Sequence, residues 1–113
     1  MIFIDKDEGE LYVPEGHDEQ VSSRSLWKNH LDCHVTTFAP GAGMIEEVHE
    51  HDTHIFYMLE GFLDVRQNGR LLRCLEKGDT VVIEAGEPHE IFNSGKTSGV
   101  FLAITFPSKR VDG

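Results

Sequence analysis

The feature that most constrains the fold of this chain is a succession of short β-type runs, each closed by a turn signal. Within the runs, apolar and β-branched residues alternate with polar ones at the period of two that is typical of half-buried strands. The clearest turn is Asn68 followed by Gly69, since both central residues of a type I′ hairpin turn need a positive φ. The pattern predicts strands over residues 34–38, 55–59, 62–67, 70–75, 80–84, 89–92 and 99–106.

No segment beyond residue 30 has a sustained helical period, and residues 21–30 fit either a short strand or a helical turn. Many short strands with frequent turns are typical of an all-β sandwich or barrel. A chain of 113 residues is long enough for one such domain and too short for two. We therefore expect a single all-β domain, with its core at residues 31–107 and an N-terminal arm at residues 1–30.

The charge and the apolar runs limit the classes of partner. A net charge of −10 repels phosphates, which argues against nucleic acids and anionic lipids as partners. The longest apolar runs have the length of strands and fall far short of a membrane span. The N-terminus lacks the basic and apolar regions of a secretory signal. These features predict a cytoplasmic protein that binds neither nucleic acid nor membrane.

Two cysteines, Cys33 and Cys74, form no CxxC pair. In a cytoplasmic protein we expect reduced thiols that are buried on strands. The alternative is that one of them faces a binding pocket.

The histidines carry the clearest chemical signal, because four of the seven cluster near predicted strand ends. His49 and His51 are two residues apart, so on a strand both imidazoles would share a face. His54 follows a plausible turn, and His89 opens a later strand. Neutral imidazole nitrogens in such a group suit a divalent metal, although an exposed polar turn would have the same composition.

From Gly43 to Asn93 the chain resembles the cupin superfamily. The first cupin motif is Gly, five residues, His-x-His, three or four residues, Glu, six residues, Gly. Here it corresponds to Gly43, His49, His51 and Gly61, with His54 at the glutamate position and one residue missing before it. The second motif matches Gly78, Gly86, His89 and Asn93, with Glu84 in place of a proline.

The resemblance implies a cupin barrel, a double-stranded β-helix or jelly roll of two antiparallel sheets. It also implies that His49, His51 and His89 bind one divalent metal per chain, with His54 as a fourth ligand. Four nitrogen donors suit Fe, Ni, Zn or Cu, and a neutral set leaves the metal a stronger Lewis acid. If His54 is not a ligand, it is a candidate base or substrate partner.

Strand parity suggests neighbours of the metal. Glu47 shares the parity of His49 and is a candidate general base, or else a solvated carboxylate. Phe56 and Met58 share the parity of His54, and Ile91 that of His89. All three are candidates to line the pocket, although core packing is the favoured role of Phe56 and Met58.

Two functions are compatible with these residues. The first is an enzyme of the dioxygenase, isomerase or cyclase type, which uses the metal on a small organic substrate that chelates it through oxygen. The second is a non-catalytic module that binds or senses a metal or small ligand. The chain contains no GxSxG or phosphate-binding glycine motif. The family resemblance further implies a homodimer.

Overall fold

The computed structural model describes residues 1–108, and within that range it contains nine strands and no helix. The absence of helix follows from the two-residue period that runs through most of the chain. The strands are β1 Leu11–Tyr12, β2 Val21–Lys28, β3 Asp32–Phe38, β4 Thr53–Glu60, β5 Phe62–Gln67, β6 Arg70–Glu76, β7 Thr80–Ile83, β8 Glu90–Phe92 and β9 Gly99–Phe106.

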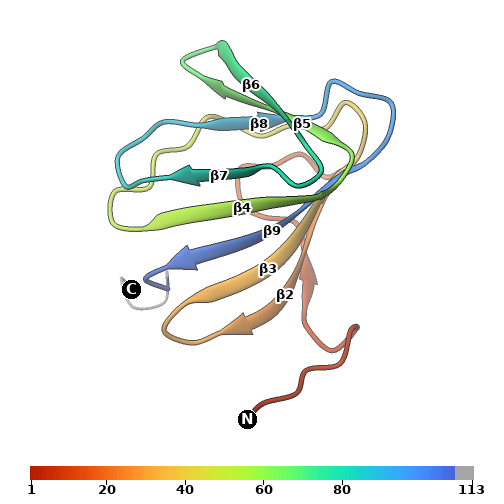
Figure 1. Ribbon diagram of the computed structural model, residues 1–113, viewed down its shortest axis with the longest axis vertical. Coiled ribbons are helices and arrows are strands. Elements are labelled where there is room, and N and C mark those ends of the chain that lie inside the picture. The colour runs from red at the N-terminus through yellow and green to blue at the C-terminus, as the bar shows by residue number, and fades with distance from the viewer. Residues whose placement is uncertain (109–113) are drawn as a thin grey trace.

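The strands form two antiparallel sheets, as the all-β prediction requires. The larger sheet has six strands in the order β1-β2-β3-β9-β4-β7, and the smaller has three in the order β6-β5-β8. In Figure 1 the smaller sheet lies across the top, and the strands of the larger sheet fan out below it. Because β9 pairs with both β3 and β4, residues far apart in sequence share one continuous surface.

The predicted hairpin is confirmed by the backbone. β5 pairs with β6, and the turn between them has φ values of 53° at Asn68 and 78° at Gly69. β5 and β9 have the predicted bounds, whereas β3 begins two residues earlier than predicted. Residues 49–51 belong to no strand, so the alternation assumed for the two histidines there is absent.

The N-terminal arm forms part of the larger sheet. Residues 21–28, left open between strand and helical turn, form β2 and pair with β3 along its whole length. β1 adds to the edge of β2. The segment between β1 and β2 is bound to residues 43–45 by backbone hydrogen bonds, of 2.9 Å from Asp18 to Gly43 and 2.9 Å from Ile45 to Gly16.

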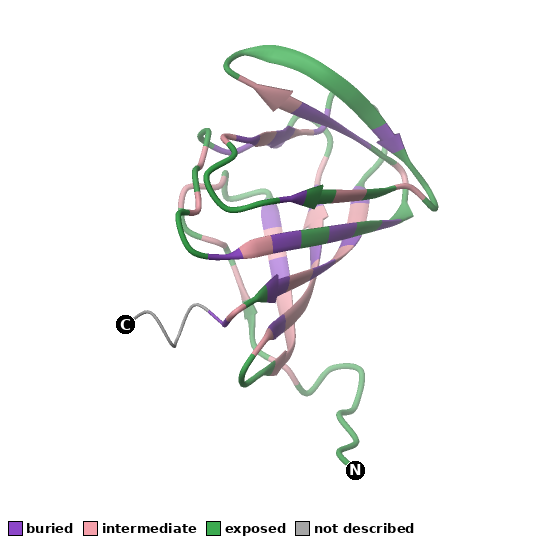
Figure 2. Cartoon of the chain, turned by 60° about the vertical axis from the view of Figure 1, so that its left-hand side comes forward, coloured by how far each residue is buried: buried purple, intermediate pink, exposed green. Residues whose placement is uncertain are grey.

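Side chains on the inner faces of the two sheets form the core. Alternate residues of β3, β4 and β9 are buried, as the banding in Figure 2 shows. Met58 and Ala103 are fully buried in this core, while Tyr57 points outward and is 44% exposed. Buried polar residues of the same strands, such as Thr36 and His54, therefore lie next to this apolar core.

Neither cysteine has a disulfide partner among residues 1–108, as expected for reduced thiols. Cys33 is half-buried on β3, but Cys74 is exposed on β6. The prediction of burial was wrong for Cys74, because the outer face of β6 is not covered by another layer. Among the described residues, no helix is long and apolar enough to cross a membrane.

The homodimer stays a prediction, and the outer face of the larger sheet is where we expect its contact. Ile55 and Tyr57 on β4 and Val82 on β7 are large side chains that are between 38% and 52% exposed. Sedimentation equilibrium is expected to give a mass of twice the 12.7 kDa of one chain. A mass equal to one chain at all concentrations would contradict the dimer.

Asn93 provides a test of the fold. Its fully buried side chain donates hydrogen bonds to the carbonyl oxygens of Phe38 (2.9 Å) and Thr97 (2.8 Å) and accepts one from Gly95 N (2.9 Å). Asn93→Ala leaves these groups without a partner, so we expect the free energy of unfolding to fall by about 2–4 kcal/mol. Urea denaturation measures the change, with the exposed Ser94→Ala as the control. A change of the same size in both variants would contradict this role.

Candidate metal centre

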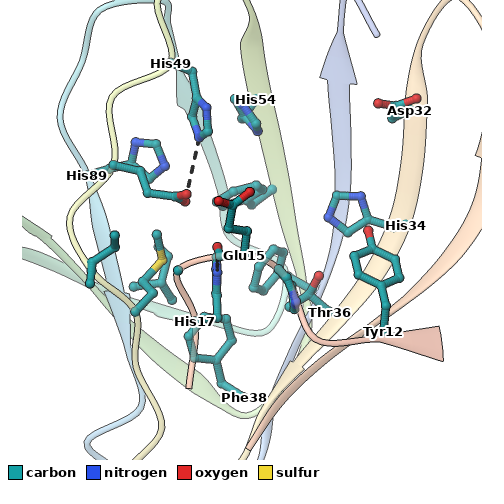
Figure 3. A pocket seen from close by; sticks show the side chains of 18 of the residues that line it. Tyr12, Glu15, His17, Asp32, His34, Thr36, Phe38, His49, His54 and His89 are labelled. Carbon is teal, nitrogen blue, oxygen red and sulfur yellow. Dashed lines mark hydrogen bonds and ion pairs between the residues drawn. The ribbon is translucent and has the colours of Figure 1, made fainter. Parts of the chain in front are cut away.

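A pocket of about 530 Å³ opens on the inner face of the larger sheet. Its floor and walls come from the inward-facing residues of β3, β4 and β9, and the segment Pro14–His17 contributes to its rim. Figure 3 shows His49, His54 and His89 grouped on one side of this pocket, with Tyr12, Asp32 and His34 on the other. The volume lies in the range of pockets that hold small organic ligands.

Three of the four predicted histidines come together. The ring centres of His49 and His54 are 4.1 Å apart, those of His49 and His89 5.1 Å, and those of His54 and His89 6.1 Å. His54 and His89 are buried, and His49 is half-buried. His49 therefore stands between the other two rings.

Glu47 joins this group from the strand-like segment before His49. Its backbone exchanges two hydrogen bonds of 2.9 Å with the backbone of His89, which fixes the two residues side by side. The Glu47 Oε1 lies 3.8 Å from His49 Nε2, the contact drawn as a dashed line in Figure 3. The donor atoms of Glu47, His49 and His89 all lie within 4.8 Å of one another.

The hydrogen bonds of His89 define its tautomer. Its Nδ1 lies 3.2 Å from the backbone carbonyl oxygen of Glu87. A carbonyl oxygen only accepts, so Nδ1 carries the proton and Nε2 keeps its lone pair. This is the arrangement in which a histidine can bind a metal through Nε2, while the other nitrogen holds the ring in place.

His54 is held on both sides. Its Nε2 lies 3.0 Å from the carboxylate of the buried Asp52, and its Nδ1 lies 3.2 Å from the hydroxyl of Thr105 on β9. Asp52 Oδ1 is also 3.9 Å from His49 Nδ1, so this carboxylate lies on the cluster side of His54. A metal can bind His54 only by replacing one of its two present partners.

The structure places His51 outside the cluster. His51 is exposed and belongs to neither group of donor atoms that could hold a metal among residues 1–108. The reason is local: residues 49–51 bend away from strand geometry, so the two histidines do not share a face. The structure instead brings Glu47 and Asp52 beside His49.

The predicted pocket residues divide into two kinds. Phe56 and Ile91 line the pocket, whereas Met58 is fully buried and packs only in the core. Phe56 contacts Phe101 with ring centres 4.5 Å apart, and Phe101 lies 6.1 Å from Phe38. These phenylalanines form an aromatic floor next to the histidines.

Four further residues lie at the pocket or the cluster: Tyr12, His17, His34 and Asp52. None of them occupies a ligand position of either cupin motif, and for His34 the sequence leaves a structural role on its strand and a pocket role both open. Only the pairing of β1, β2, β3 and β9 brings Tyr12 and His34 to the pocket.

The donor set fits a divalent transition metal. Three imidazoles with one or two carboxylates and no thiolate suit Fe, Ni, Zn or Cu. The anionic donor that the sequence interpretation lacked is supplied here by Glu47. A carboxylate ligand reduces the net charge of the centre, so a bound metal would be a weaker Lewis acid than in an all-histidine set.

A family model described as Cupin domain matches residues 34–105. Among curated proteins, the chain is 37% identical over 57 residues to the tetracenomycin polyketide synthase protein TcmJ of Streptomyces glaucescens. That match covers 50% of this chain and 38% of TcmJ, so it spans well under two thirds of the relative.

Three solved structures show the same fold. A predicted oxalate decarboxylase from Thermotoga maritima has a TM-score of 0.82 at 23% identity, covering 94% of this chain and 99% of that one. KdgF from a Halomonas species has a TM-score of 0.82 at 18% identity, covering 99% of this chain and 100% of that one. The polyketide cyclase RemF from Streptomyces resistomycificus has a TM-score of 0.81 at 19% identity, covering 93% of this chain and 78% of that one.

The first cupin motif also fits in a second register, which agrees with the geometry. Five residues separate Gly41 from Glu47, one separates Glu47 from His49, four separate His49 from His54, and six separate His54 from Gly61. This is the full family spacing with no residue missing. Glutamate and one histidine have exchanged positions, and His51 falls in the spacer.

The two registers share His49 but differ in whether His51 is a ligand, so they predict different effects of His51→Gln on metal affinity. We expect His49→Gln to weaken binding of Zn²⁺ or Ni²⁺ by at least about tenfold, because it removes the central donor. His51→Gln is the matched control and is expected to leave the affinity unchanged. Isothermal titration of the metal into metal-free protein measures both. If the two variants weaken metal binding equally, His51 is a ligand after all.

Proposed function

This chain belongs to the cupin family, and from that premise we propose that it is a metal-dependent enzyme that isomerises or cyclises a small, oxygen-chelating organic substrate. The observation that carries the proposal is the position of the histidine cluster. It forms one wall of a pocket of about 530 Å³ whose floor is aromatic. The likenesses to TcmJ and to the polyketide cyclase RemF support a substrate with several oxygens.

We assign Glu47, His49, His54 and His89 to the metal. All four line the same pocket. Glu47, His49 and His54 occupy the three ligand positions of the first motif in its second register, and His89 occupies that of the second motif. In this assignment His54 would exchange its contact with Asp52 for the metal. A divalent metal bound there would polarise a substrate carbonyl and make a neighbouring C–H bond more acidic.

The protein's own residues would orient the substrate and limit its contact with water. The phenyl rings of Phe56 and Phe101, tilted by 40° to each other, offer aromatic faces and edges that a conjugated or aromatic substrate could contact. The segment Pro14–His17 lies at the rim and is held there by its backbone bonds to residues 43–45. A substrate in the pocket would therefore be enclosed on several sides.

A second candidate rests on one specific observation. Glu47, His49 and His89 form a set of two histidines and one carboxylate, the ligand type of many non-haem iron oxygenases. With iron in the site, the same pocket would support oxidative chemistry. A binding or sensing module without turnover is the third possibility, and the following measurements separate the three.

The proposal is tested by proton exchange. Metal content is first measured by elemental analysis of untagged, anaerobically purified protein. The metal-loaded protein is then expected to accelerate deuterium exchange beside the carbonyl of a peri-hydroxylated tetralone by about a hundredfold or more, observed by NMR. Iron with oxygen uptake and no exchange would favour the oxygenase. Stoichiometric metal without either reaction would favour the binding module.

The role of Glu47 is tested separately. If Glu47 is a metal ligand, Glu47→Gln is expected to weaken metal binding by about tenfold or more and to lose exchange activity in proportion to the lost metal. Glu46→Gln, an exposed neighbour, is the control. Full metal content with lost exchange would instead make Glu47 the general base.

A further inference from the structure

The pocket has a second polar wall, opposite the histidine cluster, that the proposed function does not use. Asp32, His34 and Thr36 are successive inward-facing residues of β3, and Tyr12 of β1 lies beside them. Asp32 and Thr36 are buried, and His34 is half-buried. Polar side chains in this position cost free energy unless they are hydrogen-bonded or serve a ligand.

The strand register fixes the distance between the two walls. His34 pairs with Ala103 on β9, which pairs in turn with Phe56 on β4. His54 is the next inward-facing residue of β4, two residues from Phe56. His34 and His54 are therefore separated by two strand spacings across the sheet and by two residues along the strand. That places their backbones roughly 12 Å apart.

The surface between the walls is apolar. Phe38, Phe56 and Phe101 line the pocket between the walls, and the ring of Phe56 lies 6.1 Å from that of His54. A ligand that reaches both walls therefore needs an apolar middle.

The second wall is organised around the Tyr12 hydroxyl. Burial raises the pKa of Tyr12, a hydrogen bond with Ser23 acts in the opposite direction, and the charge of Asp32 raises it further. Ser23 is itself bonded to Thr36, with their hydroxyl oxygens 2.6 Å apart. Tyr12 thus stays a neutral phenol that can donate its proton.

The charges near this wall select the group that it can accept. Asp32 is only 8% exposed, accepts a hydrogen bond of 2.7 Å from Ser108, and its charge reaches the Tyr12 hydroxyl. A ligand carboxylate would be repelled by it. A neutral hydroxyl would not be, since it accepts from Tyr12 and donates to a neighbouring acceptor. Lys28 also lines the pocket, with its Nζ 5.2 Å from the centre of the Tyr12 ring. Its positive charge offsets the negative charge of Asp32, so this pair leaves the wall without a net charge, which suits a neutral hydroxyl.

We propose that Tyr12 and His34 bind a hydroxyl at the far end of the substrate, so that the ligand is a fused-ring aromatic with metal-binding oxygens at one end and a phenolic hydroxyl at the other. The inference rests on the proposed function for the metal end only. Tyr12 and His34 are specificity-determining residues that hold the ligand across the aromatic floor.

The test compares two dyes that differ by one hydroxyl. Alizarin carries its metal-binding oxygens toward one ring, and flavopurpurin adds a hydroxyl on the far ring. Both are titrated into zinc-loaded protein and into metal-free protein, and binding is followed by visible absorbance. Elemental analysis after dialysis checks that the dyes do not remove the zinc.

We expect zinc-loaded protein to bind flavopurpurin roughly three- to tenfold more tightly than alizarin, as one additional hydrogen bond allows. Tyr12→Phe is expected to abolish this preference with the zinc content and alizarin affinity unchanged, and His34→Gln to reduce it. Tyr57→Phe, the same substitution on the outer face, is the control. Thermal unfolding confirms that the variants are folded.

The outcomes separate this inference from the proposed function. Metal-dependent binding of both dyes without a preference would contradict the proposed role of Tyr12 and His34 and leave the proposed metal chelation unaffected. A preference that survives Tyr12→Phe and His34→Gln would do the same. Failure of both dyes to bind, or binding that is identical without zinc, would overturn the chelating substrate and the inference with it.

Discussion

The register of β3, β9 and β4 is the constraint on which the rest of the structure depends. It aligns Asp32, Thr105 and His54 in one row across the sheet, and His34, Ala103 and Phe56 in the next. Since side chains alternate between faces, a shift of one residue would turn every one of these groups outward. The register is anchored where β9 begins, because a Cβ at Gly99 would come within 2.5 Å of Leu63. Packing at that end therefore determines which side chains enter the pocket at the other.

Burial of polar groups is matched by hydrogen bonds throughout the described part of the chain. No buried side-chain nitrogen or oxygen in that part lacks a partner. Asp52 satisfies His54, Ser108 satisfies Asp32, and Asn93 binds three backbone groups at once. The first two pairs lie around the pocket. Apolar side chains there would give the same fold with a lower desolvation free energy. The excess of polarity there is what distinguishes a binding site from the rest of the core.

The sequence was sufficient for the fold and pointed to His49, His54 and His89, whose rings the structure brings together. Period-two runs and turn residues such as Asn68 are local signals, so strands β5 and β9 were predicted to the residue. His89 was found because a proline and a glycine turn mark its position. The pairing of His49 with His51 required residues 49–51 to be a strand, and alternation says nothing once the backbone bends. The sequence left a pocket role for His34 open but could not place Tyr12 beside it, because their shared location follows from pairing among four strands.

The two walls of the pocket differ in how they are built, and this difference suggests how they divide the work. Glu47, His49 and Asp52 lie outside the regular strands, so the backbone around them is less constrained than a strand that is paired on both sides. Under the proposed assignment, this would allow His54 to exchange Asp52 for a metal. Asp32, His34 and Thr36 lie on a strand bonded to neighbours on both sides, which holds their spacing rigidly. A rigid wall discriminates between ligands better than an adjustable one, since a misplaced group cannot be accommodated by small movements. Under the two proposals, selection of the substrate would fall to the wall without the metal, and chemistry to the wall that holds it.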